Sequence, residues 1–163
     1  MTTFTEIPFE LIMDELHLFL EEGRNYFNNV LEDRGFRTRF AEIVKSQETF
    51  EPNDDVVVQI AYGNVPSTPV ATLAKEDVYN FSIDVQTCLK KKIQNDALNA
   101  VAGGAVRSWL NRSVSALSRQ IGGTNINWYY SWAGDVVPGS KGSGAIKVAR
   151  IPWECKIYNI YNY

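Results

Sequence analysis

The sequence has little of the side-chain chemistry on which most enzymes rely. Its 163 residues include one histidine, His17, and no motif such as G-x-S-x-G that would position a nucleophile. His17 lies between Leu16 and Phe19 in an apolar helical stripe, so a partly buried structural histidine is favoured over a ligand or a general base. One histidine also cannot form a multi-histidine metal site. We therefore expect no catalytic, metal or cofactor site, and a protein that is not an enzyme.

Cysteines and long apolar runs are also scarce. Cys88 and Cys155 fit neither a CxxC redox pair nor a zinc pattern. No secretory signal precedes them, so two buried free thiols are favoured over a disulfide. The apolar runs are far shorter than the roughly 20 residues that a membrane helix needs, so no membrane association is expected.

An excess of positive charge is absent as well. The chain has 16 Lys and Arg against 19 Asp and Glu, which gives a formal net charge of -3. This balance argues against a general nucleic-acid binder but leaves room for a local basic patch. The segment 139–144 places Lys141 among glycines and serines, but it lacks the P-loop spacing and a helix after it. A hairpin tip is therefore favoured over a phosphate cradle.

The sequence does contain a long alternating stretch from Val78 to Leu89. Successive side chains of a strand point to opposite faces, so this pattern predicts a strand with one buried face and one polar face. The residues on its apolar side are Tyr79, Phe81, Ile83, Val85, Thr87 and Leu89. The segment 56–62, VVVQIAY, predicts a neighbouring strand that is buried on both faces.

Two amphipathic helices flank these strands. The first is expected from about Phe9 to Asp33, with Gly23 inside its apolar stripe, where a glycine can mark close approach to another element. The second is expected from about residue 95 to Gln120. Gly103 and Gly104 interrupt it, and the pair either permits close helix packing or splits the element in two.

The remaining segments predict further strands and two long loops. Arginines and phenylalanines alternate over 34–40, which favours an edge strand over a basic aromatic patch. Residues 63–77 and 133–145 are expected to be long loops of functional use. Residues 125–133 predict a strand with its aromatics on one face, and 145–163 a last strand with a bulge or kink at its proline. The aromatics are Trp128, Tyr130 and Trp132, and the proline is Pro152.

Together these elements predict the fold class. Residues 1–163 are expected to form one α+β domain, a curved antiparallel or mixed β-sheet with two long helices packed on one face. The apolar side of the central strand requires such a cover, and the two helices have the apolar stripes to provide it.

The order of elements resembles that of the tail terminator family of tailed bacteriophages and related head–tail completion proteins of the neck. The residues that carry the resemblance are the hairpin strands DVVVQIAYG and VYNFSIDVQTCL, the helix after them, and the closing strand AIKVARIPWECKIYNIYNY. The resemblance covers nearly the whole chain as a pattern, without a sharp motif. The long first helix and the extended 133–144 segment depart from it, so a stopper or another neck component stays open.

The resemblance implies a structural virion protein that assembles in the host cytoplasm. Such a protein would form a homohexameric ring at the head-proximal end of the tail tube. Its partners would be copies of itself, the tube protein, the stopper or adaptor proteins of the neck connector and, in a contractile tail, the sheath. Genome DNA would pass through the lumen without specific binding.

Residues on loops and exposed strands are the expected interface, because repeated contacts between ring subunits need edges and loops. We assign this role to Val65, Pro66, Thr68, Pro69, Trp128, Tyr130, Trp132, Lys141, Tyr161 and Tyr163. Three alternatives remain: a tube or stopper protein, a small α+β enzyme without a visible site, and a monomeric binding module.

Overall fold

The computed structural model describes residues 7–45, 55–63, 67–71, 74–112, 118–142 and 144–160. Side chains are described at all of these positions except 62, 67–71, 74 and 160. The helices are α1 (Phe9–Glu22), α2 (Arg24–Asp33) and α3 (Lys92–Leu110). The strands are β1 (Phe40–Val44), β2 (Val56–Tyr62), β3 (Ser67–Ala71), β4 (Ala74–Thr87), β5 (Arg119–Gln120), β6 (Asn127–Trp128), β7 (Tyr130–Ala133), β8 (Val137–Lys141) and β9 (Ile146–Ile160).

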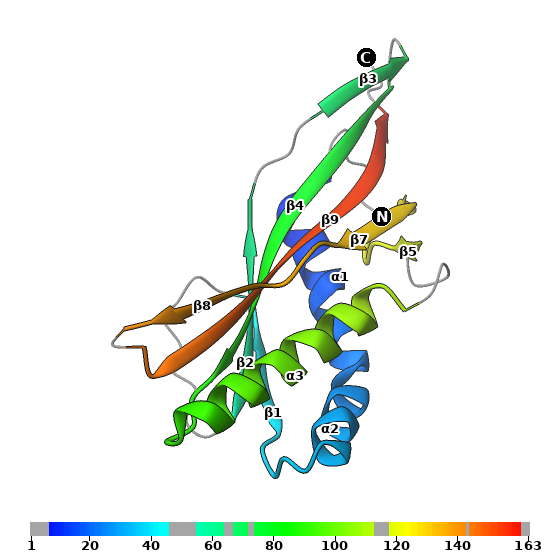
Figure 1. The fold of residues 1–163 in the computed structure, drawn as a ribbon. Coiled ribbons are helices and arrows are strands. Elements are labelled where there is room, and N and C mark those ends of the chain that lie inside the picture. The colour runs from blue at the N-terminus through cyan, green and yellow to red at the C-terminus, as the bar shows by residue number, and fades with distance from the viewer. Residues whose placement is uncertain are drawn as a thin grey trace.

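In the described part of the chain, seven strands form one mixed sheet. Its central order is β1-β2-β4-β9-β7, with β3 paired to β4 and β8 paired to β9 (Figure 1). The β1–β2 pair is parallel, and the other pairs in this sheet are antiparallel. The short strands β5 and β6 form a separate antiparallel pair. The predicted α+β class with a mixed sheet is confirmed.

Strand β4 is the centre of the sheet, as its alternation predicts. Tyr79, Phe81, Ile83 and Val85 are at most 3% exposed, while the residues between them are mostly half-exposed. The strand begins earlier than predicted, at Ala74, and ends earlier as well. All its 14 residues pair with β9 in unbroken register. Unbroken pairing with β9 on one edge, and pairing with β2 and β3 on the other, make β4 the element from which the other strands are positioned.

The helices cover the apolar face of this sheet. Helices α1 and α3 contact the strands, and residues of all three helices belong to the same buried core as the inward side chains of β2, β4 and β9. The first predicted helix is wrong in one respect, because it is two helices that meet at Gly23. A Cβ atom at Gly23 would lie 2.8 Å from atoms of the Trp109 ring on α3, so the predicted close approach is real.

Helix α3 runs through Gly103 and Gly104 without a break. A Cβ atom at Gly103 would lie 2.7 Å from the Cβ of Ala149 on β9, so this glycine permits close packing of the helix on the sheet. The predicted end at Gln120 is wrong. The helix ends at Leu110, and Arg119 and Gln120 form β5.

Both segments predicted as long loops contain strands. Residues 67–71 form β3 on the early part of β4, and residues 137–141 form β8 on the early part of β9. The described residues of β8 are exposed, apart from a half-exposed Lys141, so the strand has no alternating apolar pattern for sequence reasoning to detect. The turn between β8 and β9 is a hairpin tip, as predicted, with positive φ at Gly142 and Gly144.

Pro152 lies inside β9 without the predicted bulge. Its register with Ser82 of β4 is regular, and its carbonyl oxygen accepts a hydrogen bond from the Gly134 amide at 2.7 Å. The nitrogen and carbonyl of one strand residue face the same side, so the missing N–H faces away from β4. On that side β8 pairs only up to Arg150 and β7 begins at Trp153. The proline therefore costs the sheet no hydrogen bond.

Candidate functional site

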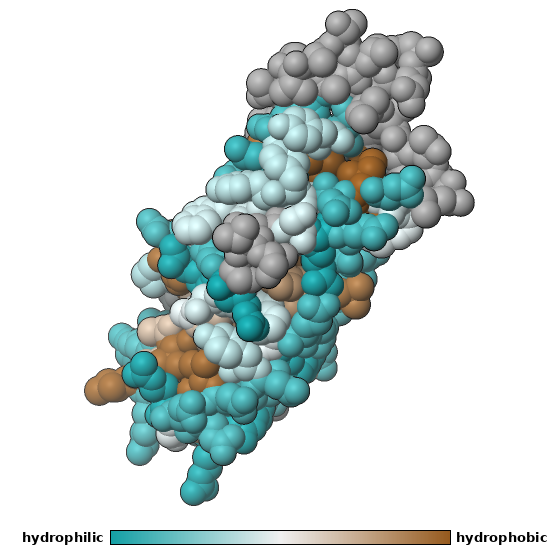
Figure 2. Space-filling model, turned by 90° about the vertical axis from the view of Figure 1, so that its right-hand side faces the viewer, coloured by the Kyte–Doolittle hydropathy of each residue, from teal (hydrophilic) through white to brown (hydrophobic). Residues whose placement is uncertain are grey.

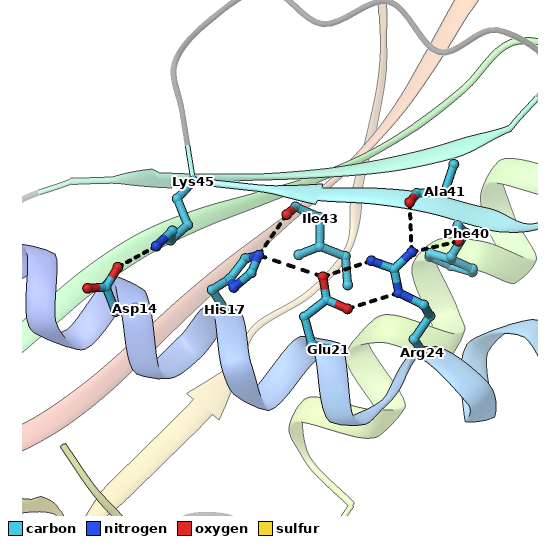
Figure 3. A network of polar contacts seen from close by, with 8 residues as sticks. All are labelled: Asp14, His17, Glu21, Arg24, Phe40, Ala41, Ile43 and Lys45. Carbon is cyan, nitrogen blue, oxygen red and sulfur yellow. Dashed lines mark hydrogen bonds and ion pairs between the residues drawn. The ribbon is translucent and has the colours of Figure 1, made fainter. Parts of the chain in front are cut away.

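Polar side chains of α1 and of the first residue of α2 cover part of the free edge of β1 (Figure 3). The carbonyl of Ile43 lies 2.8 Å from His17 Nε2, and a carbonyl can only accept, so Nε2 carries the hydrogen. Arg24 donates to the carbonyls of Phe40 and Ala41 at 3.1 and 2.7 Å. The position of His17 agrees with a partly buried structural role.

Glu21 holds Arg24 in this position. Its two carboxylate oxygens lie 2.7 and 2.9 Å from the guanidinium of Arg24, and this hydrogen bonding lowers the pKa of Glu21. The same pair raises the pKa of Arg24. Each charge is thus stabilised by the other, and the network satisfies edge carbonyls that would otherwise be open to another strand.

The opposite edge of the sheet is covered by α3 and the residue after it. The Asn111 side chain donates to the Ala133 carbonyl and accepts from the Ala133 amide, both at 2.9 Å. Arg107 donates to the Gly134 carbonyl at 2.7 Å. Because side chains occupy these backbone groups on β7 and those on β1, a strand from another molecule would have to displace them in order to pair at either place.

The described residues contain no group of three or more His, Cys, Asp or Glu that could hold a metal ion. Over the same residues, no helix is both long and apolar enough to cross a membrane. Cys88 and Cys155 are free, as predicted, but only Cys155 is buried and Cys88 is half-exposed. Burial raises the pKa of the Cys155 thiol well above its ordinary value.

The candidate site is a group of exposed and half-exposed aromatic side chains on the face of the sheet opposite the helices. We call Tyr129, Tyr130, Trp132 and Tyr158 the outer-face aromatic cluster. Tyr129 and Tyr158 stack with ring centroids 4.5 Å apart and planes 7° apart. Trp132 is 45% exposed and Tyr158 47% exposed.

The charged groups inside this cluster neutralise one another. Tyr129 donates a short hydrogen bond to Glu76, and Lys156 lies 3.9 Å from the same carboxylate. The Lys156 ammonium also lies 4.9 Å from the centre of the Tyr130 ring. Partial desolvation, followed by the bond to Glu76, raises the pKa of Tyr129. Tyr129 and the charged groups of the cluster thus already have partners, and the aromatic area that they leave exposed suits a protein interface.

The sequence predicts Trp128, Tyr130 and Trp132 on one face of a strand, but the structure places Trp128 in the core and the other two on the outer face. Trp128 is fully buried and packs at 5.3 Å, edge to face, against Trp153 of β9. Tyr129 lies between β6 and β7 and shifts the alternation, so Ser131 and Ala133 point inward while Trp132 points outward. Trp128 has no surface to offer a neighbour, and the prediction of a shared face is wrong.

The other predicted interface residues lie elsewhere. Lys141 ends β8 and is half-exposed. Thr68 and Pro69 lie in β3, whose side chains are outside the described set. Val65, Pro66, Tyr161 and Tyr163 lie outside the described residues. Sequence reasoning missed Tyr129, because strict alternation counts it on the face opposite Tyr130.

A groove separates α3 from the β8–β9 hairpin. Its volume is about 620 Å³, and its lining is mainly small or apolar, including Ala100, Gly104, Val136 and Pro138. Asn99 in its wall donates to the carbonyls of Val85 and Lys147, which are backbone groups of the sheet. The groove thus has the shape of a binding cleft, but the amide group of Asn99 in its wall is already bonded to the backbone of the sheet.

Comparisons with known proteins identify a fold neighbour. No known family profile matches the sequence, and no curated protein matches it. Among solved structures, the fold is similar to a chain in the virion of a native gene transfer agent (GTA) particle. The TM-score is 0.51 at 14% sequence identity, and the match covers 79% of this chain and 84% of that chain. At this identity the similarity is one of fold.

Proposed function

We propose that the protein is a structural component of a phage-like virion. The observation that carries this proposal is the shared fold with a chain of the gene transfer agent virion over most of both chains. The exposed aromatic cluster supports it, because a protein that acts by assembly needs contact surface. On this proposal the chain is not an enzyme and needs no cofactor.

Within that class, we propose a tail terminator that forms a homohexameric ring at the head-proximal end of the tail tube. The element order that resembles this family supports the finer assignment. The tube protein, the stopper or adaptor of the neck and neighbouring copies would be its partners. The particle would assemble in the host cytoplasm, and genome DNA would pass through the ring.

The free surfaces suggest how copies would meet. Side chains cover the outer backbone groups of β1 and β7, so strand addition at these edges is disfavoured. Contact through side chains on the outer face is therefore favoured, with Trp132 and Tyr158 as the aromatic anchors.

The native mass of the purified protein across concentration tests the proposal. Light scattering or native mass spectrometry should give a hexamer, or a monomer that closes into rings at high concentration. A strict monomer that also fails to bind purified tail tubes would contradict the terminator assignment. In that case the groove beside α3 would become the first place to look for a small-molecule ligand.

A pair of variants tests the outer-face cluster within the same assay. Trp132→Ser should leave the monomer folded and weaken assembly at least about tenfold, because central aromatics dominate interface energy. Ile93→Ser is the matched control, since Ile93 is 84% exposed at the start of α3, away from the cluster. Equal assembly by the two variants would show that the cluster is not part of the interface.

A further inference from the structure

Most Lys and Arg side chains have a partner, but six have none among the residues that the structure describes. Side chains of all 16 Lys and Arg are described. Eight form ion pairs, Arg112 lies over the Trp109 ring, and Lys75 has a contact of its own. The six whose side chains form no ion pair, hydrogen bond or ring contact with the described residues are Arg34, Arg37, Lys90, Lys91, Lys92 and Lys141.

These six residues, which we call the basic end, surround the first half of α3. Lys90 and Lys91 lie in the link from β4 to α3, Lys92 begins α3, and Arg34 and Arg37 lie in the link from α2 to β1. Figure 1 shows both links at the same, lower end of the molecule. Arg34 lines a groove of about 370 Å³ together with Ala100 of α3.

The sixth cation, Lys141, lies on the hairpin formed by β8 and β9. Lys141 ends β8, directly before the turn that leads into β9. The side chain of Asn95, in the first turn of α3, donates to the carbonyl of Ala145 in that turn at 3.0 Å. The hairpin tip and the start of α3 are therefore in contact, and Lys141 belongs to the same end of the molecule.

Few described anions oppose this charge. Asp33 and Asp55 lie on the adjoining segments, whereas Glu32 is paired with Arg39 and Asp96 with Lys147. Helix α3 has no acidic residue in its first turn and no side-chain cap, so its positive dipole end adds to the local potential. The acidic residues of segment 46–54 lie outside the described residues. The right-hand side of the molecule in Figure 1 has a mostly hydrophilic surface with scattered apolar areas (Figure 2).

We propose that the basic end binds the phosphate backbone of double-stranded nucleic acid, without reading base sequence. Four of its six cations are lysines, a residue type that is depleted in protein interfaces and common in phosphate contacts. The net charge of -3 confines the contact to this end, so binding is weak and sensitive to salt. The inference rests on the charges of one chain and goes beyond the proposed ring.

The test is fluorescence anisotropy of the full chain with a labelled duplex of about 25 base pairs, from about 50 to about 200 mM salt. If four or more phosphates are contacted, affinity should fall by about 100-fold or more over this range. The variant Lys90→Gln, Lys91→Gln, Lys92→Gln should bind at least about tenfold more weakly at the lowest salt. Its salt slope should be smaller by about 2 to 3.

The control variant is Lys45→Gln, Lys75→Gln, Arg112→Gln, which makes the same change in net charge at residues outside the basic end and outside the aromatic cluster. It should bind the duplex as the unchanged chain does. Equal losses in both variants, or no binding at the lowest salt, would overturn the inference. Polyglutamate that displaces the duplex at equal charge concentration would also overturn it, in favour of an acidic protein partner. A hexamer that ignores the duplex would refute this inference alone and leave the proposed function intact.

Discussion

Gly23 lies where α1 meets α2, and the space above its Cα is already filled. A Cβ atom there would lie 2.7 Å from Phe27 Cζ and 2.8 Å from the Trp109 ring. Overpacking of this kind costs about 1–3 kcal/mol, more than the roughly 1 kcal/mol that alanine gains in a helix. We expect Gly23→Ala to lower the free energy of unfolding by about 1–2 kcal/mol, measured by urea denaturation.

Gly104→Ala is the matched control for that experiment. Gly104 lies inside α3, and a Cβ atom there would meet nothing within 4 Å. The same change should therefore raise the stability, by up to about 1 kcal/mol. A destabilised Gly104→Ala, or a stabilised Gly23→Ala, would contradict the packing described for α3. The sequence indicates that Gly23 is unusual, but it cannot identify Trp109 as the neighbour, because that contact spans the fold.

The two cysteines should differ sharply in reactivity. Cys155 is fully buried with a raised thiol pKa, and Cys88 is half-exposed. Thiolate is the reactive form, so Cys88 should react first with a colorimetric disulfide reagent in the native protein. Cys155 should react only as fast as the protein unfolds. Cys88→Ser should remove the fast phase, and its persistence would show that the two environments are assigned the wrong way round.

Among the elements, the strands that sequence reasoning identified are those with at least one buried face. Strands β2, β4 and β9 all line the core, and their apolar residues recur at the spacing that burial requires. Strands β3 and β8 were missed, since a side-chain pattern reports burial and the residues of β8 are exposed. Their backbone pairing to β4 and β9 leaves no trace in composition. The same limit explains why Tyr129 was missed. This residue lies between β6 and β7, and it exchanges the inward and outward positions of β7 relative to strict alternation.

The cover over the β7 edge gives a prediction for an element. Asn111→Ala would leave both the amide and the carbonyl of Ala133 without their partner. We expect the free energy of unfolding to fall by about 1–3 kcal/mol, because both backbone groups are sheltered from water. Urea denaturation provides the measurement. Asn25→Ala, at an exposed position of α2, is the control and should be neutral within about 0.5 kcal/mol.

For the molecule as a whole, acid should weaken the fold through two carboxylates on α1. Arg24 lowers the pKa of Glu21, and Arg119 lowers the pKa of Glu22, below the ordinary value of 4.5. A lowered folded pKa contributes stability above the unfolded pKa, and this stability is lost as the pH falls through the folded value. The urea midpoint should therefore decrease as the pH drops below about 4.5.

The double variant Glu21→Gln, Glu22→Gln isolates this contribution. Its urea midpoint should depend less on pH below about 4.5, since neither side chain can then take up a proton. Glu10→Gln removes one exposed carboxylate of α1 that has no basic partner and serves as the comparison. An unchanged pH dependence in the double variant would show that the two ion pairs contribute nothing to the acid response. This outcome is possible for solvent-exposed pairs, and the experiment separates it from the expected one.

The pairing of β4 with β9 also determines when the central sheet can form during synthesis. Ala74 pairs with Ile160 and Thr87 with Lys147, so the central strand waits for a partner at least 60 residues further along the chain. During synthesis the backbone groups on that edge of β4 would stay unpaired until β9 leaves the ribosome. Such non-local pairing is slow, on the order of milliseconds to seconds for a sheet-rich domain. The nascent chain should therefore depend on chaperones, and a chain halted before β9 should aggregate instead of folding.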